Sequence, residues 1–175
     1  MLKKILGVIV LAIAAVLIYA ATKPDTFTLQ RSASITAPPE KLFPLIADVK
    51  AFNTWNPYAL KDPTAKMVYE GPTNGVGAAY SWDSEQLGAG RMEITEVSAP
   101  RRVQAKLEFK RPFTTTNRVE FTLQPQGADT QVTWAMSGPM PYLSKLMTTF
   151  VSMERMVGPD FEAGLANLKA LAEKR

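Results

Sequence analysis

Few side chains of this sequence are suited to catalysis. Its 175 residues include no cysteine and no histidine, which excludes thiol nucleophiles, disulfides, Cys/His zinc sites and every histidine-based triad. The nearest approaches to a carboxylate pair are Asp83 with Glu85 and Glu93 with Glu96. The first pair falls at a predicted strand end and Glu93 alternates with apolar residues, so we expect solvated carboxylates rather than acid–base partners. No metal-ligand spacing occurs either, and we predict no metal and no cofactor.

Nucleotide and nucleic-acid binding are also unsupported by the sequence. Gly75 and Gly77 in GVGAAY have no third glycine and no Gly-Lys-Ser/Thr, so hairpin turns explain them better than a phosphate-binding loop. The formal charge is +4, but Lys3, Lys4 and Lys23 belong to the N-terminal segment. The remaining basic residues form no stripe, and we predict no nucleic-acid partner.

Alternating apolar residues and recurrent turn signals organise most of the chain into strands. The segment TFTLQRSASI, residues 26–35, suits a strand with a possible irregularity near Arg31. A short amphipathic helix follows Pro38-Pro39, and we expect Pro44 to kink or break it. Six further strands are predicted between glycine- and proline-containing turns, at residues 67–70, 78–84, 91–97, 102–110, 117–124 and 131–137.

The pattern changes to helical spacing after Gly138-Pro139. Apolar residues three or four apart from Val157 to Ala172 mark one face of a long C-terminal helix, which Gly158-Pro159 should kink or restart. The order of elements is therefore strand, short helices, six strands and long helix. This order predicts an α+β fold with a curved antiparallel sheet and the long helix on one face.

One face of the predicted sheet is apolar. Its inward positions are Tyr80, Trp82, Met92, Ile94, Val103, Ala105, Leu107, Phe109, Val119, Phe121, Leu123, Val132, Trp134 and Met136. Because this set contains no carboxylate, lysine or arginine, Tyr80 is its only possible proton donor. Arg91 or Arg118 could reach the interior only in another strand register. Residue types alone do not separate a packed core from the wall of a cavity.

The first 24 residues suit a membrane anchor with a short linker. The apolar run from Ile5 to Ala21 would span about 25 Å as a helix, slightly less than the roughly 30 Å hydrocarbon core of a bilayer. Cleavage after Ala20 would leave Ile18 where a small residue is preferred, so we expect an uncleaved transmembrane helix rather than a removed signal peptide. The lysines preceding the run predict a single-pass protein of the cell (inner) membrane with a cytoplasmic N-terminus and an extracytoplasmic or periplasmic domain.

Five segments carry a family resemblance: APPEKLFPLIADVKAFNTWNPY, GPTNGVGAAYSW, GAGRMEITEVSAPRRVQAKLEF, FTLQPQGADTQVTWAMSGP and MVGPDFEAGLANLKAL. In this order they resemble the START-like helix-grip superfamily, also called SRPBCC, and within it the polyketide cyclase/dehydrase branch with an N-terminal anchor. Members wrap an antiparallel sheet around a long C-terminal helix and leave a deep apolar cavity between them. Known members bind lipids, sterols, quinones, hormones or polyketides, and a minority catalyse cyclisation or dehydration.

The resemblance implies a ligand-binding domain over residues 25–175. Its cavity wall would comprise Tyr80, Trp82, Met92, Ile94, Leu107, Phe109, Phe121, Trp134 and Met136. Trp55 and Tyr58 would lie near the mouth, and Phe161 and Leu165 would close the cavity from the helix.

Together these inferences favour a membrane-anchored, non-enzymatic domain that binds a hydrophobic small molecule such as a lipid, an isoprenoid or a polyketide-like compound. Two alternatives stay open. One is a cyclase or dehydratase acting on a polyketide-like substrate, with Tyr80 as its acid. The other is a structural partner in a membrane complex, in which the apolar face is merely packed. The sequence identifies neither the ligand nor any protein partner.

Overall fold

The computed structural model describes residues 1–174, and Arg175, the last residue of the predicted domain, lies outside the described residues. The elements are α1 (Leu2–Ala21), β1 (Thr26–Ile35), α2 (Pro39–Ala47), α3 (Val49–Asn53), α4 (Pro57–Lys61), β2 (Lys66–Glu70), β3 (Ala79–Ser84), β4 (Gly88–Ser98), β5 (Arg102–Arg111), β6 (Thr115–Gln126), β7 (Asp129–Pro139), α5 (Tyr142–Met147) and α6 (Met153–Glu173). The predicted strands and the long C-terminal helix are confirmed.

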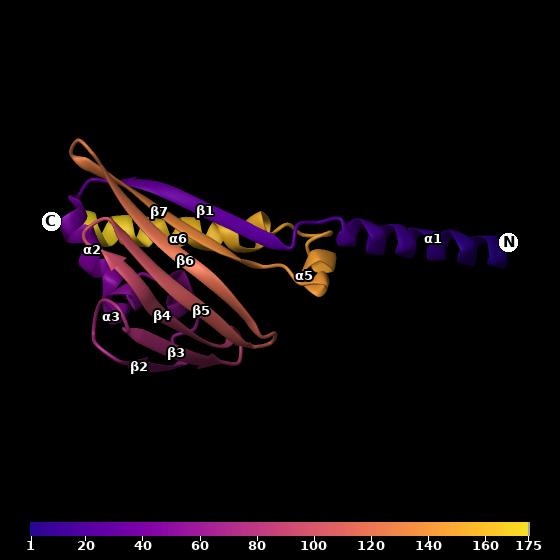
Figure 1. Cartoon of the computed structure of the whole chain (residues 1–175), viewed down its shortest axis with the longest axis horizontal. Helices are drawn as coiled ribbons and strands as arrows, with labels where there is room; N and C mark the ends of the chain where they lie inside the picture. Colours follow the sequence, from indigo (N-terminus) through magenta and orange to yellow (C-terminus); the bar gives the residue numbers. More distant parts are fainter. Residues whose placement is uncertain (175) are drawn as a thin grey trace.

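A curved antiparallel sheet of seven strands forms the body of the fold (Figure 1). The strand order is β1-β7-β6-β5-β4-β3-β2, so β2 to β7 form a meander and β1 is added beside β7. Alternation along each strand turns apolar residues to the concave face, as at Val119, Phe121 and Leu123 of β6, which are all buried. The fold is α+β, as the order of elements predicts.

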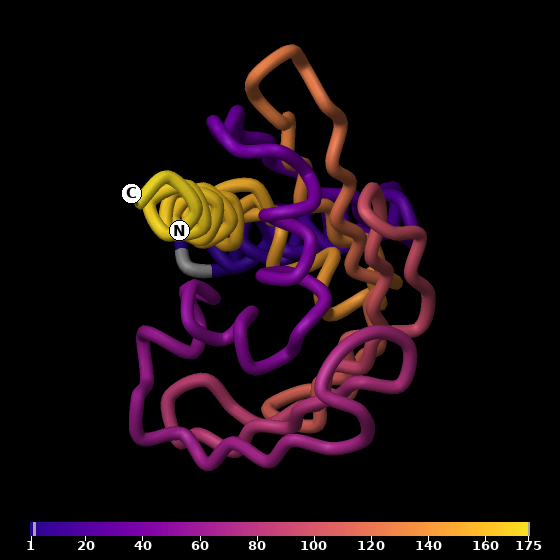
Figure 2. The backbone as a smooth tube through the Cα atoms, turned by 90° about the vertical axis from the view of Figure 1, so that its left-hand side faces the viewer, coloured from indigo at the N-terminus to yellow at the C-terminus, as the bar shows by residue number. Residues whose placement is uncertain are grey.

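Helices cover the concave face unevenly. α6 runs along it with Phe161, Leu165, Leu168 and Ala172 buried, and the sheet curves around this helix (Figure 2). The short helices α2 to α4 cover the end of the sheet near the C-terminus of α6, while α5 lies at the opposite end (Figure 1). We call these the closed end and the open end of the domain.

The irregularity expected near Arg31 is not observed. β1 pairs with β7 without interruption, and Arg31 takes an inward position between Leu29 and Ala33. Its guanidinium reaches α6, where it donates to Glu162 at 2.7 Å and to Glu154 at 2.5 Å. The arginine therefore keeps the strand regular, because the facing helix supplies two carboxylates for it.

Neither internal proline ends its helix. α2 continues through Pro44, and α6 continues through Pro159 without the expected restart. The break between the short helices comes instead at Asp48, whose backbone is extended. Its carboxylate accepts hydrogen bonds from the backbone N–H groups of Lys50 and Ala51 and so caps α3.

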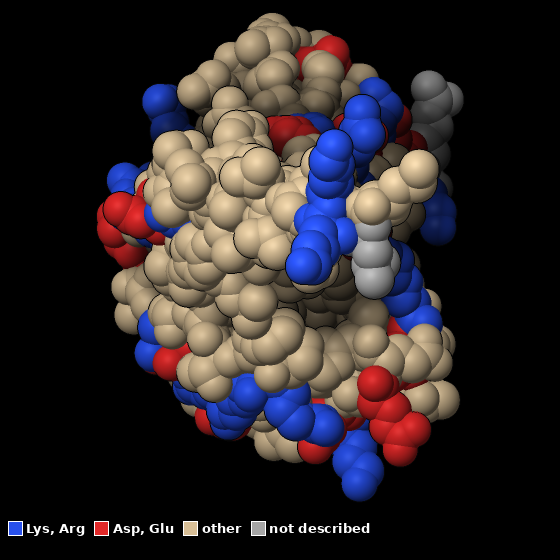
Figure 3. Space-filling model, turned by 90° about the vertical axis from the view of Figure 1, so that its right-hand side faces the viewer, with Lys and Arg blue, Asp and Glu red and all other residues tan. Residues whose placement is uncertain are grey.

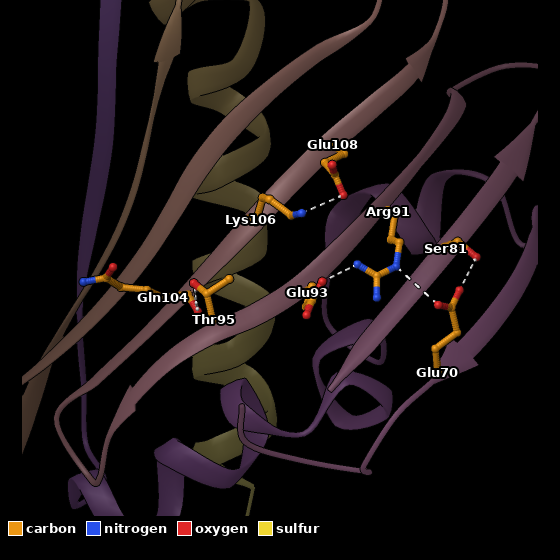
Figure 4. Close-up of polar contacts among 8 residues, drawn as sticks. All are labelled: Glu70, Ser81, Arg91, Glu93, Thr95, Gln104, Lys106 and Glu108. Carbon is orange, nitrogen blue, oxygen red and sulfur yellow. Dashed lines mark hydrogen bonds and ion pairs between the residues drawn. The ribbon is translucent and has the colours of Figure 1, made fainter. Parts of the chain in front are cut away.

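The convex face of the sheet carries chains of alternating charge (Figure 4). Arg91 on β4 pairs with Glu93 and with Glu70 of β2, and Lys106 of β5 pairs with Glu108. Arg91 and Glu93, which sequence patterns single out, thus pair with each other, and both lie on the side of the sheet opposite to α6.

Candidate functional site

A cavity lies between the concave face of the sheet and the N-terminal half of α6, at the open end of the domain. Its volume is about 430 Å³, within the roughly 300–1,000 Å³ typical of ligand pockets. Inward residues of β3 to β7 form much of its wall, and α4, α6 and the segments after β5 and β7 complete it. Arg111 is the only charged residue among the described residues that line it.

The inner end of the cavity is an aromatic floor. Trp134 of β7 stacks on Phe161 of α6 with ring centroids 4.1 Å apart. Phe52 and Trp55 meet the Trp134 indole edge-on, and Phe121 lies tilted against it at 5.1 Å. Phe52 and Trp55 come from the helical segment that covers the closed end (Figure 2). The interior is packed where the segment from α2 to Trp55 lies over the sheet, and the cavity begins on the other side of this aromatic floor.

Most residues predicted for the site lie on the cavity wall: Tyr58, Tyr80, Trp82, Met92, Leu107, Phe109, Trp134, Met136 and Phe161. Alternation finds the strand residues because every second side chain of β3 to β7 faces the interior, part of which is the hollow. Their role in holding a ligand stays a prediction.

Four predicted residues lie beyond the floor instead. Ile94, Phe121 and Leu165 are each 2% exposed or less and belong to the packed core. Trp55, expected near the mouth, is 1% exposed in the same core, and its indole N–H donates to the carbonyl of Leu45 at 2.8 Å. The position expected for Trp55 is therefore wrong, because the WNPY segment joins α3 to α4 over the closed end.

Tyr80 places a hydroxyl group in this apolar surrounding. The hydroxyl accepts a hydrogen bond from Asn56 Nδ2 at 3.3 Å, and its own proton points to the sulfur of Met92 at 4.0 Å. Sulfur is a weak acceptor, so the Tyr80 proton has no strong partner there. Burial, and then the neighbouring Tyr69, raise the pKa of the Tyr80 hydroxyl well above its usual range. The hydroxyl is therefore neutral and suited to donating a hydrogen bond rather than to releasing its proton.

Sequence analysis missed two amide side chains of the wall. Asn56 is 4% exposed and bonds Tyr80, which lies 24 residues away along the chain. Asn117 is 6% exposed, and among the described residues its Oδ1 has no hydrogen-bond partner. Alternation could have identified Asn117, since it lies two residues before the inward Val119. No sequence pattern relates Asn56 to Tyr80, because the contact depends on how α4 approaches β3.

A second depression, of about 550 Å³, lies mainly on the outer side of β4 to β7. Thr95, Lys106 and Arg118 line it, and its floor is the solvated side of the sheet. It is an open trough without enclosing helices. The strand register also places Arg91 opposite Ser81 and Arg118 opposite Ser137 on this outer side, so neither arginine reaches the inner cavity.

The N-terminal helix leaves the domain at the open end (Figure 1). From Lys3 to Ala21 it is long and apolar enough to cross a membrane, although an N-terminal signal sequence would meet the same criteria. Its apolar side chains from Ile5 to Val10 are exposed, apart from Gly7, which has no side chain. The helix therefore has no packing partner in the domain for most of its length.

Sequence comparison assigns this arrangement to a family. Residues 26–173 match the family model described as "Polyketide cyclase / dehydrase and lipid transport". The chain belongs to this polyketide cyclase/dehydrase and lipid transport family. The match begins at β1 and ends at the last residue of α6, so it covers the sheet and helix that enclose the cavity and leaves α1 outside. A search of curated proteins gave no significant match.

Solved structures share the fold of this family member at low sequence identity. Protein MLL2253 from Mesorhizobium loti is 19% identical, with a TM-score of 0.60 over 85% of this chain and 100% of that chain. Protein CV1439 from Chromobacterium violaceum is 18% identical, with a TM-score of 0.58 over 87% and 100%. Ara h 8.0201 is 12% identical, with a TM-score of 0.54 over 83% and 99%. At these identities the likeness establishes the helix-grip fold alone.

Proposed function

We propose that this family member binds a hydrophobic small molecule in the cavity between its sheet and α6, while α1 holds it in the cell membrane. The carrying observation is an enclosed apolar space of about 430 Å³ whose one lining charge, Arg111 among the described residues, is 56% exposed. Each methylene group moved from water into such a space contributes about 0.8 kcal/mol, so an alkyl or isoprenoid chain needs no charged clamp.

The Tyr80–Asn56 pair on the cavity wall predicts one polar group on the ligand. A Tyr80 proton without a strong acceptor would be satisfied by a carbonyl, ether or hydroxyl oxygen. We therefore infer a mainly apolar molecule with one oxygen function, inserted with that oxygen toward the floor and with its chain toward the mouth.

The anchor part of the proposal rests on α1. Lys3 and Lys4 precede its apolar run and Lys23 follows it, which favours a cytoplasmic N-terminus and an extracytoplasmic domain. The anchor would keep the open end of the cavity close to the membrane, where apolar ligands are concentrated.

Binding is favoured over the two alternatives. A cyclase or dehydratase needs a proton donor or acceptor that ionises readily, and the raised pKa of Tyr80 works against this role. A packed structural partner needs a filled interior, whereas the open end of this domain is hollow.

Native mass spectrometry of the full chain, extracted from membranes in polymer-bounded lipid discs, tests the proposal. We expect a stoichiometric apolar adduct that solvent extraction then identifies. Leu107→Trp fills part of the cavity and should reduce the adduct several-fold, while Lys106→Trp, one residue along β5 on the outer face, should retain it. Tyr80→Phe should weaken binding about tenfold, the cost of one lost hydrogen bond. A chain without adduct, or equal occupancy in the two tryptophan variants, would contradict the proposal.

A further inference from the structure

The mouth of the cavity lies at the end of the domain from which α1 leaves. Phe113 of the loop between β5 and β6, and Met140 and Ser144 of the segment after β7, line the cavity at this end. We call residues 112–114 and 140–152 the rim. Figure 3 looks onto this end of the molecule: uncharged residues occupy most of the face, a group of basic side chains stands near its centre, and the other charged residues lie toward its edges.

The rim exposes large apolar side chains. Phe150 is 72% exposed, Phe113 57% and Leu143 51%. Residues 140–152 contain one charged side chain, Lys145, which is 7% exposed and bound to Asp25. The segment therefore shows no free charge to water, although it lies on the surface. An apolar patch of this kind marks a surface that contacts a partner or a membrane.

Hydrogen bonds fix the rim at the level of the last turns of α1. The Tyr142 hydroxyl donates to the carbonyl of Leu17 at 3.0 Å, and Leu17 lies four residues before the end of the helix. At 1.5 Å per residue this contact is about 6 Å inside the end of α1. Lys23 also approaches Thr148, with 3.4 Å between Nζ and Oγ1. Contacts of the linker hold the domain close to the helix end, because Lys23 and Asp25 both bond to the rim.

We propose that the rim inserts into the interfacial layer of the bilayer that α1 spans, so that the cavity mouth opens directly onto lipid. This inference rests on the proposed function, which supplies the anchor and the apolar ligand. A helix that spans the bilayer places its last turn at the hydrocarbon boundary, and the rim is held at that level. Interfacial segments bury their apolar side chains about 5–10 Å into this region.

The residue types of the rim are those that lie at a lipid interface. Tyr142 would lie at the membrane–water interface, a region where aromatic residues with a polar tip are enriched. Lys110, which is exposed next to the loop 112–114, and Lys23 carry the positive charge that anionic headgroups attract. The ligand then moves between bilayer and cavity without its apolar surface crossing water, which removes the main barrier to its transfer.

Site-directed fluorescence on the full chain tests this arrangement. The chain has no cysteine, so one introduced cysteine is the only labelling site. An environment-sensitive dye is attached in Leu143→Cys, Phe150→Cys, Val10→Cys and Ala128→Cys. Val10 lies in α1, and Ala128 lies in the exposed β6–β7 turn at the far end of the domain. Each variant is reconstituted into phosphatidylcholine vesicles with one quarter phosphatidylglycerol, and quenching by spin-labelled lipids is measured.

The inference expects quenching at positions 143 and 150 at least threefold stronger than at position 128, with strong quenching at position 10. Strong quenching at position 10 with 143 and 150 no different from 128 overturns the rim contact and leaves the anchor intact. Absence of quenching at position 10 overturns the anchor and the inference with it. Blue-shifted emission at 143 and 150 without lipid quenching means that a second copy of the chain covers the rim, and this also overturns the proposal.

The rate of ligand uptake distinguishes a cavity mouth that opens onto lipid from one that is apolar but faces water. The probe is a pyrene-labelled fatty acid in the same vesicles, followed by energy transfer from the tryptophans at the cavity. Leu143→Asp/Phe150→Asp changes two exposed residues outside the cavity wall, and Ala128→Asp is its control. We expect uptake about tenfold slower in the rim variant, with unchanged final occupancy. An unchanged rate at equal occupancy refutes the inference.

Discussion

The closed and open ends of the interior are built from the same strands but are filled differently. On β6, Phe121 is packed at the closed end, while Asn117 borders the cavity at the open end. On β5, Ala105 is buried in the core, while Phe109 lines the hollow. Large side chains occur at both ends, so the size of the strand residues does not decide which end is hollow. The deciding difference is the covering: the helical segment from α2 to α4 places Phe52 and Trp55 against Trp134 at the closed end.

The largest expected contrast between the two ends comes from truncating one phenylalanine in each. Phe121→Ala should lower the free energy of unfolding by about 3–5 kcal/mol, because Phe121 is 2% exposed and its removal leaves a cavity inside a packed cluster. Phe109→Ala should cost only about 1–2 kcal/mol, because Phe109 already borders a hollow and, among the described residues, meets only Trp82 as an aromatic neighbour. Urea unfolding of both variants measures the difference.

Ligand binding should show the opposite order. Phe109→Ala alters the cavity wall and should weaken binding, whereas Phe121→Ala, measured well below its lowered melting temperature, should retain it. Equal losses of stability in the two variants would show that the open end is packed in solution, and the comparison between the ends would fail.

This contrast also shows how far the sequence alone leads. The period of two in segments such as RRVQAKLEFK indicates which residues face inward, and the period near 3.6 after Val157 identifies α6. These local patterns are sufficient for the fold and for most of the cavity wall. They predict one apolar face for both ends, because Phe121 and Phe109 have the same alternation.

Contacts between residues far apart in the sequence decide which part of the interior is packed and which part is hollow. Trp55 fills the closed end only because Asp48 ends α2 and redirects the chain over the sheet. Asn56 reaches Tyr80 only through this same path. Arg31 looked like an interruption of β1 because its two carboxylate partners lie more than 120 residues away on α6. Such contacts leave no periodic signal in the sequence.

Two glycines of α6 offer a finer comparison of the ends. A Cβ added at Gly164, at the closed end, would lie 2.7 Å from the Trp134 ring and 2.9 Å from Pro57. A Cβ added at Gly158, at the open end, would lie 2.4 Å from the Arg31 guanidinium, the far end of a flexible side chain. Alanine gains about 1 kcal/mol over glycine within a helix, while overpacking a rigid site costs about 1–3 kcal/mol.

Gly164→Ala should therefore lose up to about 2 kcal/mol of stability. Gly158→Ala should stay within about 0.5 kcal/mol of the parent, since displacing Arg31 weakens solvent-accessible ion pairs that are worth about 0–1 kcal/mol. Thermal unfolding of the two single variants provides the measurement. A stabilised Gly164→Ala variant would mean that Trp134 and Pro57 can move apart, and that the aromatic floor is softer than the geometry indicates.

The smallest expected effect is a loosening of the open end in acid. Asp62 connects the loop after α4 to β3 at this end of the domain. Its carboxylate accepts hydrogen bonds from the Ser84 hydroxyl at 2.6 Å and from the Thr64 hydroxyl at 2.5 Å. These bonds, that of Ser84 first, lower the pKa of Asp62 below its ordinary value. The folded state thus favours the charged form, so the contribution of Asp62 is complete above about pH 4–5 and is lost as the pH falls through its lowered pKa.

Hydrogen exchange resolved by peptide, corrected for intrinsic rates and measured between pH 6 and pH 3, tests where this loss occurs. Protection should decrease around residues 62–66 and 84–88, near the cavity wall at Ala65 and Leu87. It should persist around Phe52 and Phe121, because the aromatic side chains that pack there do not titrate between pH 6 and pH 3. Asp62→Asn should abolish the local pH dependence, because the amide does not titrate in this range. A uniform loss of protection at both ends would indicate that the domain unfolds as one cooperative unit. The hydrogen bonds of Asp62 would then not stabilise the open end separately from the aromatic floor.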